Sequence, residues 1–243
     1  MPSRRLPQTD ANRSKALITC ARRTSTLSAG AWLITVAQNN TLNGLLSSWR
    51  NNQNAAGGGL SVQTGATSAS QQCLTRTVRI ISHFIQVLDM AIERGALPPS
   101  VRPLYQLNAS HGGVPDINTV ADALLWAQRL ADGEAARINQ GGAPLAWPAV
   151  SEVTAEADLL RAAADTQSTD KLLFDQAQEA IATQRPAIDT HIRDLWDTIE
   201  YNLRHEPDAA SLRRKAREWG VVYINDDGSE ETDEPAPAPT PVP

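Results

Sequence analysis

The sequence is poor in the residue types that build sheets or cross membranes. Aromatic residues make up 5% of the chain, and alanine and leucine supply much of the 41% that is hydrophobic. Ala and Leu lose little conformational freedom in a helix, whereas strands favour branched and aromatic side chains. No run approaches the roughly 20 apolar residues that span a bilayer. The composition therefore predicts a mainly α-helical protein with no transmembrane segment.

The N-terminus, MPSRRLPQTD, carries charge but is not followed by the apolar segment of a secretory signal. We therefore expect a cytoplasmic protein, and export by a non-classical route is left open. Cysteine is equally scarce, since only Cys20 and Cys73 occur and each lies in a predicted helix. Two small, buried or half-buried thiols are expected rather than a disulfide.

The chain also lacks a basic excess, and its acidity is confined to one end. Six acidic residues in residues 226–243, which contain no Lys or Arg, account for more than the net charge of −5, so that removing them leaves the body at +1. A general nucleic-acid-binding surface would require a basic excess. The same segment ends in PAPAPTPVP, and it is expected to be disordered.

Two apolar repeats at spacings of three and four residues predict the strongest helices. One runs from Val78 to Ile92 and the other from Ile188 to Leu203. Thr9 or Asp10 is expected to cap the first helix, and Thr119 with Asp122 approximates a capping box. Breaks are expected at the glycine run 57–59, near 168–170 and at Pro186, where a new helix would begin.

These features predict an all-α bundle of long, antiparallel, amphipathic helices, with a short C-terminal extended segment before the tail. Residues 1–225 would form a single helical domain. Residues 29–107 and 150–220 are similar enough in helix pattern that a weak internal repeat is left open. The run Val221–Ile224 is the one strand-like segment. Because a lone strand cannot satisfy its own backbone, it should pair with another chain or pack as an extended segment.

Catalytic and metal-binding patterns are missing. The four histidines, His83, His111, His191 and His205, lack the spacing of a di-iron or zinc site and are interpreted as structural or surface residues. The glycines 57–59 lack the lysine and the strand–helix context of a phosphate loop. We therefore predict neither a cofactor nor a metal, and the sequence favours a non-enzymatic protein without settling the point.

Two weaker patterns have simpler explanations. Ser168 and Lys171 satisfy S-x-x-K, but none of the companion motifs is present. Asp194, Asp197 and Glu200 share one helix face, where they could hold a cation or act as an acid–base pair. A solvated face paired with Arg193 or Arg204 is the more common arrangement.

The most distinctive cluster is basic and lies just before the strand-like run. Its cations could contact phosphates, an acidic partner or the acidic tail, and pairing with the tail or solvent is favoured. The segment 213–224, RRKAREWGVVYI, resembles C-terminal stretches of uncharacterised bacterial proteins, which implies no function. The candidate partner-binding residues are Arg213, Arg214, Lys215, Arg217, Trp219, Val221, Val222, Tyr223 and Ile224.

Three functional hypotheses follow. The first is a structural or interaction protein that self-assembles into a homo-oligomer or docks onto another protein, because the helices are long and chemical motifs are missing. The second is nucleic-acid binding through the basic helix 211–219, with the acidic tail as a competitor. The third is an enzyme or small-ligand carrier with a site between helices, near His191 and Glu200.

Overall fold

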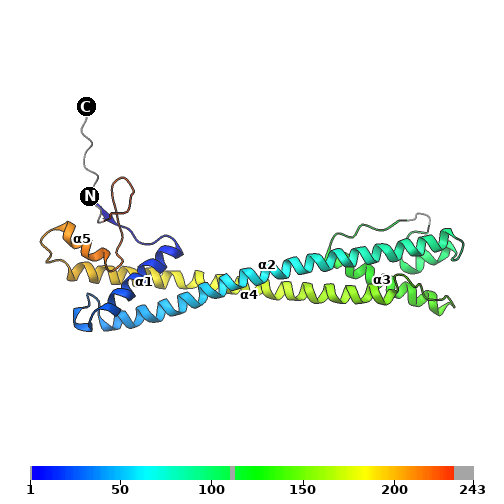
Figure 1. Cartoon of the computed structure of the whole chain (residues 1–243), viewed down its shortest axis with the longest axis horizontal. Helices are drawn as coiled ribbons and strands as arrows, with labels where there is room; N and C mark the ends of the chain where they lie inside the picture. The colour runs from blue at the N-terminus through cyan, green and yellow to red at the C-terminus, as the bar shows by residue number, and fades with distance from the viewer. Residues whose placement is uncertain (1, 110–112, 233–243) are drawn as a thin grey trace, which may run out of the picture. The chain divides into compact units, whose positions relative to one another are not determined.

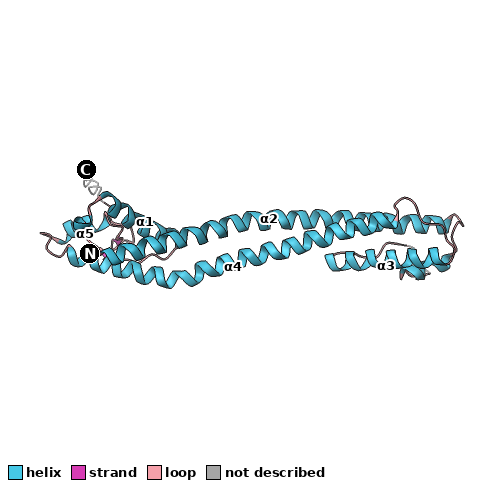
Figure 2. Cartoon of the chain, turned by 90° about the horizontal axis from the view of Figure 1, so that it is seen from below, coloured by secondary structure: helices cyan, strands magenta, loops and turns pink. Residues whose placement is uncertain are grey.

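The structure is a computed structural model that describes residues 2–109 and 113–232. Most of these residues are helical, and two short strands form a two-stranded sheet (Figure 2). The predicted all-α class is therefore confirmed. The elements follow in the order β1 (Ser3–Arg4), α1 (Asp10–Thr26), η1 (Ala29–Ala31), α2 (Val36–Glu93), η2 (Pro99–Tyr105), α3 (Val120–Asn139), α4 (Val150–Asn202), α5 (Ala209–Arg217) and β2 (Tyr223–Ile224) (Figure 1).

The chain divides into two compact units, the first formed by two segments that are distant in the sequence and the second by one continuous segment. The first unit comprises residues 1–55 and 177–243, and the second comprises residues 56–176. Helices α2 and α4 each contribute one part to both units. The first unit therefore also contains α1, α5 and both strands, and the second also contains η2 and α3.

The core of the first unit is built from α1, the beginning of α2, the end of α4 and the C-terminal segment. All five residues of the predicted seam from Ile188 to Leu203 are buried, which confirms this amphipathic face. Trp49 and Trp196 are among the largest fully buried side chains. Cys20 is buried and free, as expected, and burial raises the pKa of its thiol to about 12.

The core of the second unit joins α2 to η2, α3 and α4. Ile81, Ile85 and Leu88 of the predicted α2 seam are buried, and Val78 and Ile92 pack at its margins. The same cluster includes buried residues of the other elements, among them Tyr105, Ala127, Leu130, Val153 and Leu160. Cys73, the other free cysteine, is half-buried beside this cluster.

Both predicted helix caps are present. The Thr9 side chain accepts a hydrogen bond of 3.2 Å from the Asn12 N–H and so begins α1 at Asp10. Thr119 and Asp122 form the reciprocal capping box that begins α3. These caps satisfy first-turn amides that have no partner inside the helix.

The expected helix breaks are absent, which corrects the prediction. Helix α2 continues through Gly57, Gly58 and Gly59, and α4 continues through residues 168–170 and through Pro186. Each glycine costs about 1 kcal/mol relative to alanine and an interior proline about 3 kcal/mol. At Pro186 the helix persists because buried side chains, Ile181 and Ile188, anchor it on either side.

The strand-like run pairs within the chain, so that a second chain is not needed to satisfy its backbone. Strand β2 lies antiparallel to β1, with Ser3 opposite Ile224 and Arg4 opposite Tyr223. On its other side Ile224 forms a bridge with Glu230, and the Glu231 N–H donates to the Tyr223 carbonyl at 2.9 Å. Residues 226–232 of the acidic segment thus return along β2, and residues 233–243 lie outside the described part.

No helix in the described residues combines the length and the apolar character that a bilayer crossing requires.

Candidate functional site

The basic helix α5 holds three of its four cations in ion pairs. Arg213 and Arg217 lie one turn apart and share Glu231, with closest nitrogen–oxygen distances of 3.0 and 2.7 Å. Lys215 pairs with Glu206 at 2.6 Å, and the Arg214 side chain is exposed. The structure therefore contains the expected pairing between the basic cluster and the acidic segment, in a form that shields Arg213 and Arg217 from solvent.

Three of the other predicted site residues lie in the core. Trp219, Val221 and Tyr223 are each less than 5% exposed. Gly220 lies between them with φ of +90°, and a Cβ there would lie 2.9 Å from the Ala16 carbonyl oxygen. The C-terminal segment is thus packed tightly against α1, and among these residues Val222 and Ile224 are half-exposed.

The carboxylate face of α4 pairs with the N-terminal strand rather than with Arg193 or Arg204. The Arg4 guanidinium lies 2.6 Å from Asp197 and 2.9 Å from Glu200. The Tyr223 hydroxyl donates to the other oxygen of Glu200 at 2.5 Å. Burial and this carboxylate raise the pKa of Tyr223. The face therefore fastens β1 and β2 to α4, a contact that the helix-based expectation missed.

His191 and Glu200 do not form a joint site. His191 is buried, and its Nε2 has no hydrogen-bond partner among the described residues. Burial lowers the pKa of His191, which favours the neutral imidazole. His83 and His205 are exposed, and His111 lies outside the described residues. No group of His, Cys, Asp and Glu in the described residues could hold a metal ion.

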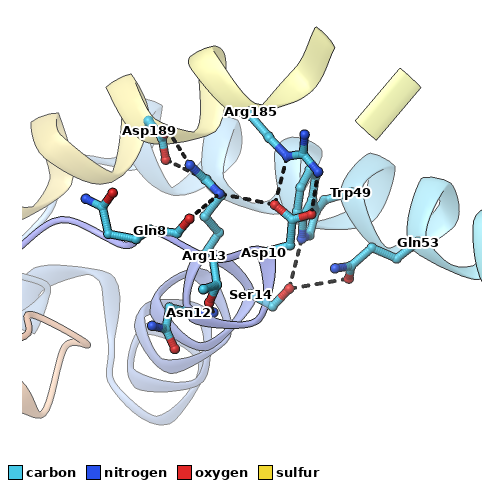
Figure 3. Close-up of polar contacts among 10 residues, drawn as sticks. Gln8, Asp10, Asn12, Arg13, Ser14, Trp49, Gln53, Arg185 and Asp189 are labelled. Atoms are coloured by element: carbon cyan, nitrogen blue, oxygen red, sulfur yellow. Dashed lines mark hydrogen bonds and ion pairs between the residues drawn. The ribbon is translucent and has the colours of Figure 1, made fainter. Parts of the chain in front are cut away.

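A network of paired charges joins α1 to α4 in the first unit (Figure 3). Arg13 contacts both oxygens of Asp189, and Arg185 contacts both oxygens of Asp10, all at 2.7–2.9 Å. Arg13 also reaches Asp10 at 3.1 Å, so the four residues form a continuous chain. No local pattern in the sequence indicates this network, because its partners on α1 and α4 are about 175 residues apart.

A second charged cluster is buried in the second unit. Arg137 contacts Glu134 at 2.7 Å and donates to the Tyr105 hydroxyl at 2.8 Å, while that hydroxyl donates to Glu134 at 2.5 Å. Glu134 also accepts from the Leu145 N–H at 2.7 Å. Burial tends to raise the pKa of Glu134, but these hydrogen bonds outweigh it and hold the pKa low. Because the partners satisfy one another, the cluster fastens η2 and the loop after α3 instead of offering a reactive group.

Ser168 and Lys171 offer no catalytic environment. Both side chains are exposed on the continuous helix α4. A lysine that activates a serine is held beside it in a desolvated site. The exposed surface of α4 provides no such site.

The second unit instead carries an uncharged outer surface on α4. We name it the outer stripe; it repeats at spacings of three and four residues and lies on the side of α4 opposite Ala157 and Leu160, which face the core. All of its residues are exposed, and its two leucines are 53% and 57% exposed. The outer stripe comprises Leu159, Ala162, Thr166, Thr169 and Leu173.

The stretch of α2 that neighbours the outer stripe is uncharged as well. Residues 60–75 of α2, which accompany this stretch of α4, contain no Asp, Glu, Lys or Arg. Helix surfaces of a globular protein are ordinarily charged, so a long neutral stretch is a mark of contact.

Trp147 is the other conspicuous apolar feature of the second unit. It is 84% exposed and borders an open groove that also contains Met90, His83 and Glu152. The groove mixes both charge signs with apolar groups, so it does not define one class of ligand. The remaining tryptophans are buried or half-buried, as expected for core anchors.

Comparisons of the chain with family models, with curated proteins and with solved structures give no match.

Proposed function

We propose that this protein is a non-enzymatic structural protein that self-assembles, and that two copies associate through the outer stripe of α4. The observation that carries the proposal is the exposure of Leu159 and Leu173, each more than half exposed, at the ends of a row of five uncharged residues that Asp158 and Asp165 border. Exposed apolar side chains at helical spacing are typical of a surface that another helix covers.

The helix pair beneath the stripe has little apolar burial of its own. No residue in 57–69 of α2 or 161–176 of α4 is buried. Gly57, Gly58, Gly59 and Gly65 lie within this part of α2, and each lowers helix stability by about 1 kcal/mol relative to alanine. Helices in proteins gain most of their stability from packing an apolar face. A second copy would supply the packing that this stretch lacks.

A second copy suits the stripe better than a charged partner. A neutral surface does not repel an identical surface, and it offers no charge to attract an acidic or basic macromolecule. A two-fold interface brings the same patch of both copies together. The centre of the stripe, Thr166, would then face Thr166 of the other copy, whether the two α4 helices run parallel or antiparallel.

This mode of assembly differs from strand addition by β2. Both sides of β2 already have partners in β1 and at Glu230. Nucleic-acid binding by α5 has less support, because Arg213 and Arg217 are already paired with Glu231. The outer stripe of α4 is therefore better supported as the contact region than β2 or α5.

Disulfide cross-linking tests this geometry. In a chain carrying Cys73→Ser, Thr166→Cys should form a covalent dimer on mild oxidation, because the two thiols would meet at the two-fold axis. Ser168→Cys is the matched control, since Ser168 is equally exposed on α4 but lies outside the stripe. Equal cross-linking of both variants, or of neither, would contradict the proposed interface.

A further inference from the structure

A cavity of about 330 Å³ lies in the first unit between α1, the segment that precedes it and the C-terminal segment. One wall is the face of α1 that carries Asn12, Lys15 and Thr19. Residues 5–8 and the C-terminal residues Gly220, Val221, Val222 and Ile224 also line the cavity. This volume is at the lower end of the range for pockets that hold small molecules, about 300–1,000 Å³.

The charges around the cavity are unevenly distributed. Arg5, Lys15 and Arg217 line it together with a single carboxylate, Glu230. Glu231 already contacts Arg217 at 2.7 Å, and Glu230 contacts Lys15, which leaves Arg5 as a further cation of the lining. The cavity therefore has a net positive lining that favours an anion.

Glu230 occupies the place that an anionic ligand would take. Its carboxylate lies 3.3 Å from the Lys15 ammonium, and the two side chains are 49% and 63% exposed. Exposed ion pairs of this kind contribute little to stability. Glu230 can consequently be displaced from Lys15 at small cost, and the bridge to Ile224 places it at the edge of the cavity.

The rest of the lining is apolar. Leu6, Val222 and Ile224 contribute aliphatic side chains, and Pro7 and Ala16 extend this surface. A free inorganic anion would leave these groups in contact with water. An aliphatic chain attached to the anion would bury them, with a favourable free energy proportional to the apolar area covered.

We infer that this cavity binds a short aliphatic carboxylate, whose acid group replaces Glu230 at Lys15, with Arg5 as a second cation of the lining, and whose chain covers Leu6, Val222 and Ile224. Binding at this site is independent of the outer stripe, because every lining residue belongs to the first unit.

Hexanoate is a suitable probe for the full-length chain, with 1-hexanol and inorganic phosphate as the matched ligands. Hexanoate should give saturable shifts of the amide resonances of Thr19, Gly220 and Val222. Hexanol lacks the charge and phosphate lacks the chain, so each should bind at least about tenfold more weakly. The absence of a saturable shift with hexanoate, or equal binding of either matched ligand, would overturn the inference.

Two substitutions of exposed residues test the role of the charges. Lys15→Gln should weaken hexanoate binding by up to about fivefold, because it removes a cation from the acid group. Glu230→Gln should strengthen binding by up to about fivefold, because the competing carboxylate is gone. Lys171→Gln, an exposed substitution in the second unit, should leave the affinity unchanged. A Glu230→Gln variant that binds more weakly than the original chain would contradict the displacement.

Discussion

Arg13 and Asp189 join α1 to α4 through two parallel hydrogen bonds, from Nε to Oδ1 at 2.7 Å and from Nη2 to Oδ2 at 2.8 Å. Arg13 is 9% exposed, so its buried positive charge is stabilised mainly by Asp189 and Asp10. Bidentate pairs are the strongest ion pairs that proteins form, because both groups are held in a fixed geometry. The charged network therefore holds α1 in position together with the apolar core.

Asp189→Asn should lower the free energy of unfolding by about 2 kcal/mol, because it leaves a largely buried guanidinium without its main counter-charge. Urea unfolding monitored by circular dichroism measures the loss. Asp158→Asn is the control, since Asp158 forms an exposed ion pair with Arg161 and its loss should cost less than about 0.5 kcal/mol. Equal losses in the two variants would show that the Arg13 pair has no special role.

Acid should weaken the same network. The hydrogen bond from Arg185 is the largest influence on Asp10 and holds its pKa below the ordinary value of 3.8. A pKa lowered by folding gives a stabilisation that is complete above the unfolded pKa and is lost as the pH falls through the folded pKa. The unfolding free energy should therefore decline below about pH 4. This decline should be smaller in Asp10→Asn, and the exposed substitution Asp116→Asn should leave it unchanged.

His191 should make stability depend on pH in a higher range. Burial lowers its pKa below the ordinary value of 6.5, so the unfolded chain binds a proton more readily than the folded one. The contribution of the neutral His191 to the unfolding free energy is complete above the unfolded pKa. It decreases as the pH falls below about 6.5 towards the folded pKa. His191→Asn should reduce the difference in unfolding free energy between pH 7 and pH 5. His83→Asn, at an exposed position, should not; an unchanged difference in His191→Asn would contradict this role.

Two glycine substitutions should act in opposite directions. Gly58 has open space where a Cβ would lie, so Gly58→Ala should stabilise α2 by up to about 1 kcal/mol. At Gly133 of α3 a Cβ would lie 2.8 Å from the Cα of Tyr105, which is backbone and cannot move aside. Gly133→Ala should therefore destabilise the protein by about 1–3 kcal/mol. Thermal unfolding compares the stabilities of the two variants. A Gly133→Ala variant as stable as the original chain would show that η2 and α3 do not approach so closely.

Local patterns predicted the local structure well. The seam from Ile188 to Leu203 and the caps at Thr9 and Thr119 were all readable because their partners lie within a few residues. The errors arose where packing outweighs local preference. Pro186 is a poor helix residue in isolation, yet it lies inside a long helix whose residues on either side, Ile181 and Ile188, are buried.

The tertiary partners could not be predicted from one sequence. β1 is two residues long, so nothing in Ser3 and Arg4 marked them as the partner of β2. Likewise, nothing near Glu200 in the sequence indicated that Arg4 would neutralise it. The outer stripe was readable in principle, because its spacing and its lack of charge are local features. Its exposure, however, depends on which face of α4 the core uses.

Sedimentation equilibrium of the full chain at micromolar concentration tests the central proposal most directly. The account predicts a dimer, with twice the mass of the 26.2 kDa chain. In Leu159→Lys/Leu173→Lys the dimer should dissociate to a folded monomer, because both sites are already exposed and lysine favours helices as leucine does. Leu125→Lys, 49% exposed on α3, should remain dimeric. A chain that is monomeric throughout, or a dimer unaffected by the two lysines, would contradict self-assembly through the outer stripe.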